Sequence, residues 1–454
     1  MNKISKCVES IKQGIDQSKT KLQLTSAQAK TAGAMIDIVS RWGYVFNMGE
    51  TGAGKSYMCL DVANRLLNEN IFIICPATVT TSWQELKSKY ISKDFKIISY
   101  DKFRGSSKHN NSDFVTINSD GTFTAKKYLE ACVDVGATFI FDECHKLKND
   151  SLQKGVSSFV LNYSISRSEK TKIIFASGTL MDNEECSKNF FGLIGIRRGE
   201  ILQKCALIDP ESTNTCREES DFILFKEVIL KNTSVFCAAY KPEVNVMNCF
   251  FDLNESVEIF EGMIDKLEEY TTKKFNAATR ASFTKDCITI ELLKVGIFVE
   301  AAKAELDKGH KVVLIFNFIE PLEKCSELLR GYSPLIFRGS TSTKRRREYL
   351  NLFQDDSSGR SLIIGNMQVL AEGIDLDDKT GIYKRMVFAS PNYSMIRTHQ
   401  LTNRFSRMDT MTIADVHWVY ANQGQKEKNI IEALKNKSKV ISSITDIKRK
   451  SDSI

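Results

Sequence analysis

One loop of the sequence carries residue types that suit the binding of a phosphate chain. The segment "GETGAGKS" fits the pattern G-x-x-x-x-G-K-[ST], follows the apolar run "GYVFNM" and precedes a helical pattern. Its glycines let backbone N–H groups turn toward phosphate oxygens, and the helix that starts near Lys55 adds the positive end of its dipole. A glycine-rich turn that merely contains Lys-Ser is the competing interpretation. We expect nucleotide phosphates to bind at Gly49, Glu50, Thr51, Gly52, Ala53, Gly54, Lys55 and Ser56.

An acidic pair further along the chain supplies what a bound nucleotide would still need. "DECHKLKND" (142–150) follows the apolar stretch "ATFIF". Mg²⁺ prefers oxygen ligands and keeps several waters, so Ser56 and Asp142 would hold it, Asp142 through water. Glu143 would orient and deprotonate the attacking water. A solvated turn after a buried strand is the alternative. A metal site at His145 is disfavoured because no second histidine or cysteine is suitably spaced.

Two arginines near the other end of the chain could act on the same phosphates. "QLTNRFSRMD" (400–409) places Arg404 and Arg407 three positions apart, so we expect both on one face of a helix. Two guanidinium groups aimed across a cleft can neutralise the charge that develops on a transferred phosphoryl group. An exposed basic helix is the alternative interpretation.

Ten short apolar runs, bounded by turn residues, predict the strands that position these groups. Helical patterns such as 56–69 and 340–354 fit between several of them, and strands that alternate with helices indicate parallel sheets with helices on both faces. The expected fold is therefore α/β, with two tandem lobes. The runs cover 43–48, 70–76, 95–100, 137–143 and 171–178 in the first lobe, and 310–318, 333–339, 360–366, 384–391 and 413–420 in the second.

The same patterns predict the domain organisation. Residues 1–245 are expected to form the first lobe and 306–436 the second. The stretch 246–305 carries long helical patterns such as "ESVEIFEGMIDKLEEYTTKKF" and is interpreted as a helical connector or insertion. The polar tail 437–454 is expected to be frayed.

Composition limits the class of protein. The 454 residues are 42% hydrophobic and carry a net charge of +7, from 63 basic and 56 acidic residues, which is typical of a globular protein and compatible with a polyanionic partner. The twelve cysteines form no C-x-x-C pair, and no apolar run reaches the length of a membrane span. The N-terminus lacks the apolar core of a signal peptide. We expect a reducing interior such as a cytoplasm, or a host cytoplasm or virion if the chain is viral, and no membrane partner.

The order of motifs resembles the superfamily-two helicases and translocases over about residues 20–425. The resemblance is closest to the Swi/Snf-type DNA-dependent ATPases, especially the compact forms of large DNA viruses and phages. Beyond the phosphate loop and the DECH box, the similar segments are "TSAQAKTAGAMID", "ICPATVTTSWQEL" (motif Ia), "SYDKF" (Ib), "SGTLMDN" (III), "VVLIFNF" with "FRGSTSTKRRREYLNLFQ" (IV), "LAEGIDLDD" (V) and "QLTNRFSRM" (VI). Leu180 and Asn403 depart from the family pattern, which usually has proline and glycine there.

The resemblance implies two RecA-like lobes with ATP and Mg²⁺ between them, and it implies residue roles. Gln28 would read adenine, and Gln400 would join the two arginines in catalysis. Gly373 and Asp375 of motif V would contact the nucleotide. His145 would couple the ATP site to motif III, near Ser177 and Thr179. The expected nucleic-acid contacts are Thr78, Ser99, Arg338, Ser340, Thr341 and Gly373; the basic run Lys344–Arg347 could grip phosphate or be the solvated face of a helix.

The resulting functional hypothesis is a nucleic-acid-stimulated ATPase that translocates on duplex DNA and could unwind it, in transcription, replication or repair. The trailing Lys148 and Asn149 of the DECH box favour DNA over RNA through the resemblance alone. An RNA helicase of the same superfamily shares the chemistry. A nucleotide-gated subunit of a transcription or replication complex, without motor activity, is the alternative from another class.

Overall fold

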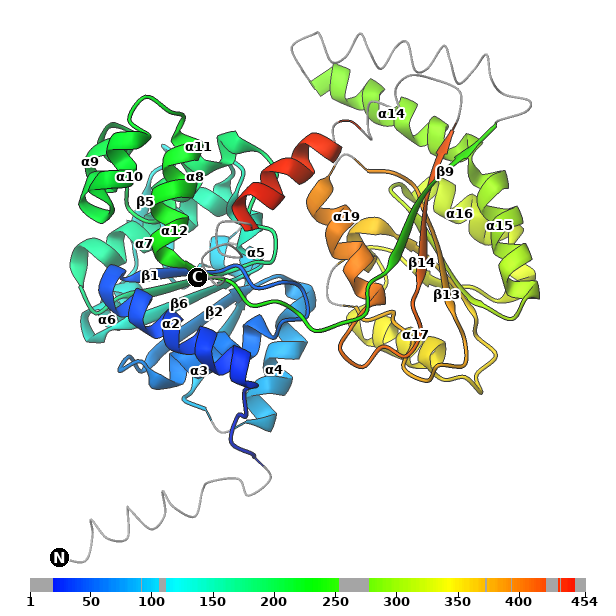
Figure 1. The fold of residues 1–454 in the computed structure, drawn as a ribbon, viewed down its shortest axis with the longest axis horizontal. Helices are drawn as coiled ribbons and strands as arrows, with labels where there is room; N and C mark the ends of the chain where they lie inside the picture. Colours follow the sequence, from blue (N-terminus) through cyan, green and yellow to red (C-terminus); the bar gives the residue numbers. More distant parts are fainter. Residues whose placement is uncertain are drawn as a thin grey trace, which may run out of the picture. The chain divides into compact units, whose positions relative to one another are not determined.

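The computed structural model describes residues 19–90, 92–105, 112–252, 277–371, 374–392, 394–421, 432 and 434–445. The chain divides into two compact units: the first comprises residues 1–239 and 441–454, and the second comprises 240–440 (Figure 1). Within the described ranges, no helix combines the length and the apolar composition needed to cross a bilayer.

The first unit is built on a six-stranded sheet in the order β3-β2-β6-β7-β1-β8, and every neighbouring pair in it is parallel. Because the strands are parallel, their carboxyl ends meet at one edge of the sheet, and the chain leaves each strand there. The strands are β1 (Tyr44–Asn47), β2 (Asn70–Cys75), β3 (Phe95–Ser99), β6 (Ala137–Asp142), β7 (Lys172–Ala176) and β8 (Ser234–Val235).

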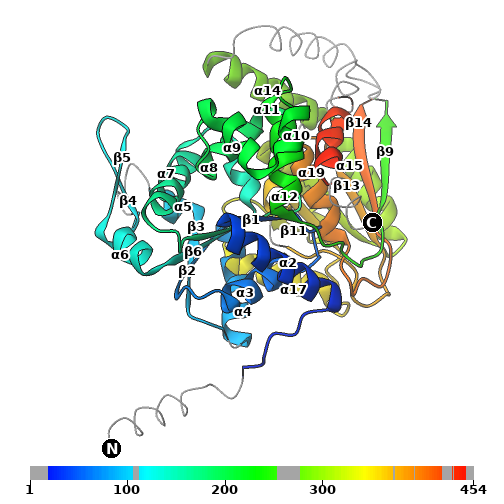
Figure 2. The same cartoon turned by 60° about the vertical axis from the view of Figure 1, so that its left-hand side comes forward.

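The two faces of this sheet bury different kinds of side chain because successive residues of a strand point to opposite faces. One face is aliphatic, with Val45, Ile73 and Ile140 among the residues that pack under α2 (Ser26–Trp42), α3 (Lys55–Arg65) and α4 (Thr80–Lys89). The other face is aromatic: the rings of Phe46 and Phe175 are stacked with their centroids 4.9 Å apart. Figure 2 shows the sheet between these two layers of helices.

The remaining helices of the first unit include those of the aromatic layer, and a two-stranded antiparallel hairpin precedes α6. The elements are α5 (Tyr100–Arg104), the hairpin β4 (Val115–Ile117) and β5 (Phe123–Ala125), α6 (Lys127–Val135), α7 (Leu152–Arg167), α8 (Ser187–Leu193), α9 (Ile201–Ile208), α10 (Pro210–Thr215), α11 (Asp221–Leu224) and α12 (Lys231–Thr233), with a π-helical stretch at Phe225–Leu230.

The second unit repeats the design with a six-stranded parallel sheet in the order β11-β12-β10-β13-β14-β9. Its strands are β9 (Asn245–Phe251), β10 (Lys311–Phe316), β11 (Leu335–Phe337), β12 (Leu362–Asn366), β13 (Arg385–Ala389) and β14 (Asp415–Ala421). One face packs against α17 (Thr343–Gln354), α18 (Met367–Leu370) and α19 (Met395–Thr402), and the other against α15 (Val295–Asp307) and α16 (Ile319–Leu328); α14 (Ala277–Leu293) precedes α15.

All ten apolar runs are strands whose ends lie within two residues of the predicted ones, so the expected α/β fold with two parallel lobes is confirmed. The short strand β8 and the edge strand β9 were not predicted. Neither segment forms an apolar run in the sequence, because β8 has only two residues and β9 mixes asparagine with hydrophobic residues.

The domain boundaries differ from the expected ones. The second unit starts at Tyr240, and 246–305 is not a separate connector, because β9 completes the second sheet and α15 buries Phe298 in the second core. The pattern 255–275 lies outside the described residues. The expectation of a frayed tail, made for 437–454, is wrong for 437–445, which are helical and bury Ile444.

Candidate nucleotide site

The phosphate loop lies between the carboxyl end of β1 and the first turn of α3. Gly52 (φ 94°) and Gly54 (φ 83°) adopt left-handed conformations that side chains rarely allow. A Cβ added to Gly54 would lie 2.4 Å from Nε2 of Gln28, so a side chain there would displace the end of Gln28 from the loop. The Nζ atom of Lys55 donates to the carbonyl oxygens of Gly49 (2.9 Å) and Glu50 (3.1 Å), which places the ammonium group over the loop.

Asn47 supports this loop from beneath and was missed in the sequence. It is the last residue of β1 and is fully buried, and its Oδ1 accepts a hydrogen bond from Gly49 N–H at 3.1 Å. On the other side, Glu50 Oε2 accepts from Ala239 N–H at 3.1 Å. A polar residue at the end of an otherwise apolar strand is the signal that could have identified Asn47.

Gln28 lies against the phosphate loop. Its Nε2 donates to the carbonyl of Ala53 at 3.0 Å, and its Oε1 accepts from Thr25 N–H at 3.0 Å as half of a capping box at the start of α2. Both ends of the amide are therefore engaged, and its expected role in reading adenine stays a prediction.

Asp142 ends β6 at the same edge of the sheet, and donors reach both of its carboxylate oxygens. Trp83 Nε1 donates to Oδ2 at 2.8 Å, and Glu143 N–H donates to Oδ1 at 3.1 Å. A third donor, the hydroxyl of Tyr100, bonds the Asp142 carbonyl at 3.0 Å. The sequence placed Trp83 in motif Ia but gave it no role. These bonds fix the orientation of the carboxylate.

Burial, together with the nearby charge of Glu143, raises the pKa of Asp142 from its usual value to about 6. The Trp83 hydrogen bond and the charge of Lys55 act in the opposite direction. Asp142 is therefore a carboxylate at neutral pH, held in a buried place where a cation is favourable.

Glu143 and His145 connect the acidic pair to motif III. Glu143 has φ 54°, which is left-handed and rare for a residue other than glycine or asparagine. His145 Nδ1 lies 3.2 Å from Glu143 Oε2 and 3.1 Å from Ser177 Oγ. Ser177 in turn donates to the carbonyl of Thr179 at 2.9 Å. The expected coupling residues therefore form one bonded chain, although their role in coupling stays a prediction.

Motif III also touches the phosphate loop directly. A Cβ added to Gly178 would lie 3.2 Å from Thr51 Oγ1 and 3.3 Å from both Gly49 O and Lys55 Nζ. The loop and motif III therefore pack closely, and a side chain at Gly178 would displace atoms of the phosphate loop.

Lys148 and Asn149 have structural partners in the first unit. Lys148 forms a buried ion pair with Asp182, and its carbonyl accepts from Asn189 Nδ2 at 2.7 Å. Asn149 lies beside Cys186. These contacts tie the DECH box to motif III and to the segment after it.

Thr78 and Ser99, two of the expected nucleic-acid contacts, lie at the carboxyl ends of the neighbouring strands β2 and β3. Thr78 is in a 3₁₀ turn, Ala77–Val79, that leads into α4. Ser99 caps α5, with its Oγ accepting from Lys102 N–H at 3.3 Å. Both residues are partly exposed at the edge that also carries Asp142.

The arginines of motif VI do not share a helix face, so that expectation is wrong. Helix α19 ends at Thr402, Arg404 lies in the 3₁₀ turn Asn403–Phe405, and Ser406 is extended before Arg407. Arg404 Nε donates to the Ala371 carbonyl at 2.9 Å. Gln400, the third expected catalytic residue of motif VI, is buried in α19.

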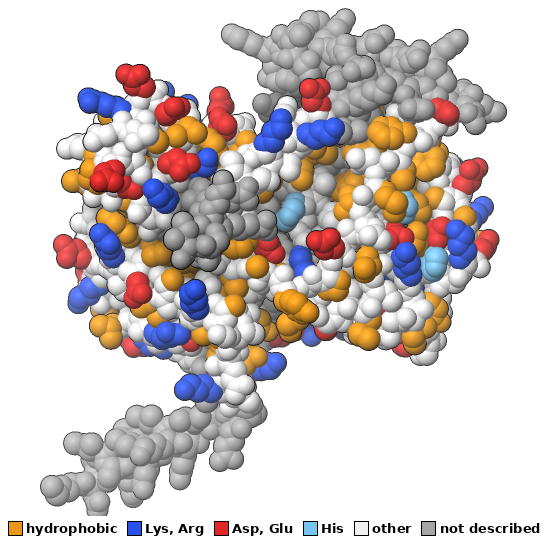
Figure 3. All heavy atoms as spheres, in the orientation of Figure 1, with side chains coloured by type: hydrophobic (Ala, Val, Ile, Leu, Met, Phe, Trp, Pro, Cys, Tyr) orange, Lys and Arg blue, Asp and Glu red, His pale blue; other side chains and the backbone are white. Residues whose placement is uncertain are grey.

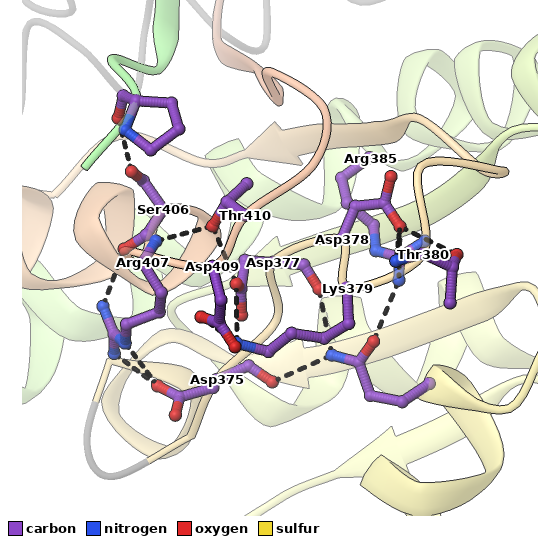
Figure 4. Close-up of polar contacts among 12 residues, drawn as sticks. Asp375, Asp377, Asp378, Lys379, Thr380, Arg385, Ser406, Arg407, Asp409 and Thr410 are labelled. Atoms are coloured by element: carbon purple, nitrogen blue, oxygen red, sulfur yellow. Dashed lines mark hydrogen bonds and ion pairs between the residues drawn. The ribbon is translucent and has the colours of Figure 1, made fainter.

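Asp375 is the partner of Arg407, whose Nε donates to its carboxylate at 2.8 Å (Figure 4). Around this pair, the motif V loop is bonded to the segment after motif VI: Thr410 Oγ1 donates to Asp377 at 2.7 Å, and Lys379 bridges Asp377 and Asp409. Gly373 lies outside the described residues.

The candidate nucleic-acid contacts of the second unit lie between β11 and α17. Arg338 is exposed and pairs with Glu323 at 2.7 Å, while Thr341 Oγ1 accepts from Arg338 N–H at 3.2 Å. Ser340 is exposed beside them. Of the basic run, Lys344, Arg345 and Arg347 are exposed on the first turns of α17, whereas Arg346 donates to the carbonyls of Arg338 and Gly339.

The residues of the first unit fit a magnesium nucleotide. The loop supplies left-handed glycines and a cation, Ser56 lies in the first turn of α3, and Asp142 presents an ionised carboxylate. Magnesium usually takes one or two protein oxygens beside phosphates and water, which is what these two residues offer.

Comparisons with known proteins agree with this reading. Residues 15–180 match the family described as "Type III restriction enzyme, res subunit", and residues 288–409 match the "Helicase conserved C-terminal domain". The chain belongs to the superfamily-two helicases. The first match contains the phosphate loop and the DECH box of this helicase, and the second contains Asp375, Arg404 and Arg407.

A relative of this helicase is the Acanthamoeba polyphaga mimivirus protein L364, whose name gives it as a candidate ATP-dependent RNA helicase. The two are 23% identical, over 91% of this chain and 82% of the relative. Among solved structures, the DUF1998 helicase MrfA, bound to DNA and AMPPNP, has a TM-score of 0.52 at 12% identity. That match covers 94% of this chain, which spans about half (52%) of MrfA, and it shows the fold of tandem RecA-like lobes.

Two positions depart from the pattern of the resemblance. Leu180 replaces the expected proline and is buried beside Met181. Asn403 replaces the expected glycine; its Nδ2 donates to the His399 carbonyl at 2.8 Å, and its Oδ1 accepts from Lys241. Neither departure removes a group that would contact nucleotide.

Proposed function

We propose that this helicase is an ATP-dependent nucleic-acid motor that hydrolyses ATP to ADP and phosphate while it translocates on duplex DNA. One observation carries the proposal. The carboxyl edge of the first sheet joins the phosphate loop, Asp142, Glu143 and the His145–Ser177 link through direct contacts. A protein that only bound nucleotide would not need a placed water-activating carboxylate or a bonded path away from it.

In the proposed mechanism, each group of the first unit has a chemical task. Backbone N–H groups of the loop and Lys55 bind the phosphates, and Ser56 and Asp142 would hold Mg²⁺, which supplies neutralising charge when it is bound. Glu143 orients a water molecule and accepts its proton. His145 then links the state of Glu143 to motif III through Ser177.

The second unit would complete the reaction by closure. Arg404 and Arg407 would stabilise the negative charge that accumulates on the transferred phosphoryl group. Since Arg407 is paired with Asp375, closure must either release this guanidinium or deliver it with its carboxylate partner. Turnover would then depend on the arrangement of the two units, as a motor requires.

Contacts to nucleic acid would be local contacts to phosphate. On the face drawn in Figure 3, basic and acidic side chains are interspersed, which agrees with a net charge of only +7. The hydroxyl groups of Thr78, Ser99 and Ser340 and the exposed cations of α17 suit such contacts, which carry little sequence information.

The choice of DNA is supported by the resemblance to the Swi/Snf-type ATPases and by MrfA, a structural relative solved with bound DNA. RNA is the second candidate, because the mimivirus relative is named for it. Lys148 does not favour either one, since its charge is taken up by Asp182 inside the first unit. A role in transcription, replication or repair, and a complex that serves one of them, follow from the same proposal.

The deciding experiment measures ATP hydrolysis without nucleic acid and with duplex DNA, single-stranded DNA or RNA. We expect duplex DNA to stimulate the wild type most strongly and Glu143→Gln to remove the turnover. Stimulation by RNA alone would replace DNA with RNA in the proposal. If no nucleic acid stimulated turnover, the motor would be refuted in favour of the nucleotide-gated subunit. A strand-displacement assay then separates unwinding from translocation.

A further inference from the structure

Two buried aromatic residues join the candidate nucleic-acid edge of the first unit to Asp142. Trp83 belongs to α4, which begins two residues after Thr78. Tyr100 follows Ser99 directly and begins α5. Both side chains are almost fully buried, with 1% and 3% exposed. Each segment with a candidate phosphate contact therefore sends one aromatic side chain inward.

These two side chains meet at the same residue. The indole of Trp83 donates to Asp142 Oδ2 at 2.8 Å, and the hydroxyl of Tyr100 donates to the Asp142 carbonyl at 3.0 Å. An indole N–H is a donor only, so its bond requires an acceptor oxygen on Asp142. Because both bonds are buried and directed, a shift of α4 moves the carboxylate of Asp142, and a shift of α5 moves its backbone carbonyl.

The surrounding packing leaves these aromatic rings little freedom. Trp83 packs edge to face with Phe95 of β3, with centroids 6.3 Å apart, and Tyr100 packs on Phe141 of β6 at 6.4 Å. Both partners are buried strand residues. A movement at the exposed start of α4 or α5 is therefore passed on as a movement of the hydrogen-bonding atom.

We propose that Trp83 and Tyr100 are positioning residues that transmit the occupancy of motifs Ia and Ib to Asp142, Trp83 at the carboxylate that would hold Mg²⁺ and Tyr100 at the backbone carbonyl. This inference rests on the proposed function. It adds a second path to the one through His145, and the two paths meet at neighbouring residues, since His145 contacts Glu143 whereas the aromatic donors contact Asp142. Binding of nucleic acid would then change the position of Asp142 without acting through His145.

The test compares Trp83→Phe and Tyr100→Phe with the wild type. Tyr100→Phe keeps the ring and removes the hydroxyl, whereas Trp83→Phe replaces the indole with a smaller phenyl ring and removes the N–H donor. We measure the ratio of nucleic-acid-stimulated to unstimulated kcat, with whichever of duplex DNA, single-stranded DNA or RNA stimulates the wild type most, and the affinity for that nucleic acid by fluorescence anisotropy. Losing a buried bond to a charged group should lower the ratio about ten-fold in Trp83→Phe, and losing the bond to a neutral carbonyl about three-fold in Tyr100→Phe. The nucleic-acid affinity should stay within about two-fold of the wild type.

A binding measurement without turnover separates the two routes. The Mg²⁺ concentration needed to half-saturate binding of a fluorescent ADP analogue should rise about five-fold in Trp83→Phe, which changes the carboxylate, and should not change in Tyr100→Phe, which changes only the carbonyl bond. Trp418→Phe and Tyr44→Phe are matched controls, because both are buried aromatic residues on strands. Both controls should keep the wild-type ratio and Mg²⁺ requirement.

The outcomes separate this inference from the function on which it rests. If the wild type itself is not stimulated, the proposed motor fails and the coupling fails with it. If the wild type is stimulated and both variants keep its ratio, only the coupling is overturned. A ratio that falls together with the nucleic-acid affinity, or that falls equally in the control variants, also overturns it, because general loosening of the unit would explain that result.

Discussion

Asp142 is a deeply buried carboxyl group, and because burial raises its pKa to about 6, its protonation changes just below neutral pH. Its pKa is raised to about 6, so the folded protein takes up a proton there below about pH 6, whereas an unfolded chain does so only near pH 4. By linkage, the contribution of Asp142 to stability is greatest at low pH and is lost as the pH rises through about 6.

This titration predicts how Mg²⁺ binding depends on pH. Since Mg²⁺ requires the ionised carboxylate, the Mg²⁺ needed to bind a fluorescent ADP analogue should rise by about ten-fold for each pH unit below 6. The measurement is a Mg²⁺ titration between pH 5 and 8. Asp142→Asn provides the background due to the nucleotide's own phosphates, and equal slopes in the two proteins would contradict the prediction.

Glu143 holds a left-handed backbone that favours asparagine, so function and stability should separate at this residue. Glu143→Asn should raise the free energy of unfolding by about 0.5–1 kcal/mol, because asparagine tolerates this conformation better. The same variant should lower kcat by about 100-fold or more, since no carboxylate remains to accept the proton. Urea unfolding and ATP hydrolysis test the two parts. Glu143→Gln, which removes the charge without easing the backbone, should lose activity without gaining stability.

At the scale of single residues, the sequence predicted which groups belong to the site better than how they are held. The spacing of "GETGAGKS" and "DECH" identified Lys55 and Asp142 because those chemistries need fixed neighbours along the chain. The Trp83–Asp142 bond joins residues 59 positions apart. The left-handed conformation of Glu143 depends on packing, and neither feature leaves a local pattern to find.

Helix α17 connects two features of the second unit. Its first turns carry the exposed Lys344 and Arg345, and its last residue, Gln354, donates to the carbonyls of Asp375 (3.3 Å) and Asp377 (3.1 Å). The helix thus joins a basic surface to the loop that holds Arg407. The sequence of motif VI has a helical pattern, so its helix was predicted too long. In the structure, Arg404 and Arg407 bond to the motif V segment, and the helix ends before them.

The basic end of α17 predicts a salt effect. Lys344→Ala with Arg345→Ala should weaken nucleic-acid binding at low salt and reduce the dependence of log K on log salt by about one to two units, because each lost phosphate contact removes one released counterion. Binding titrations at several salt concentrations test this. Lys308→Ala, a change at an exposed lysine after α15, is the control and should leave the slope unchanged. An unchanged slope in the double variant would assign these residues to a solvated helix face.

At the scale of the whole molecule, the loop proposed to bind phosphate and the two arginines proposed to neutralise the transferred group belong to separate units. The first unit should therefore bind Mg²⁺-nucleotide without the arginines, while turnover should need them. Arg407→Ala is expected to keep the affinity for a fluorescent ADP analogue within about three-fold and to lower kcat about 100-fold or more. Equal losses in affinity and kcat would place Arg407 in ground-state binding instead.

The architecture was the most predictable part, because a strand buried on both faces is an unbroken apolar run and every central strand of the two sheets was visible as one. The edge strand β9 was less predictable. β9 packs less deeply than the central strands, so its composition is mixed, and only its pairing with β14 reveals that residues 245–251 open the second unit.

That pairing has a consequence for synthesis on the ribosome. Asn245 pairs with Asp415 and Phe251 with Ala421, so β9 leaves the ribosome long before β14, its neighbour among the described strands, has been made. During that interval the segment "NVMNCFF" has no strand partner, and such apolar segments are prone to pair with other chains. Slower translation between residues 251 and 415 should lower the soluble yield of the full chain, and a charge at the exposed Val246 should restore it.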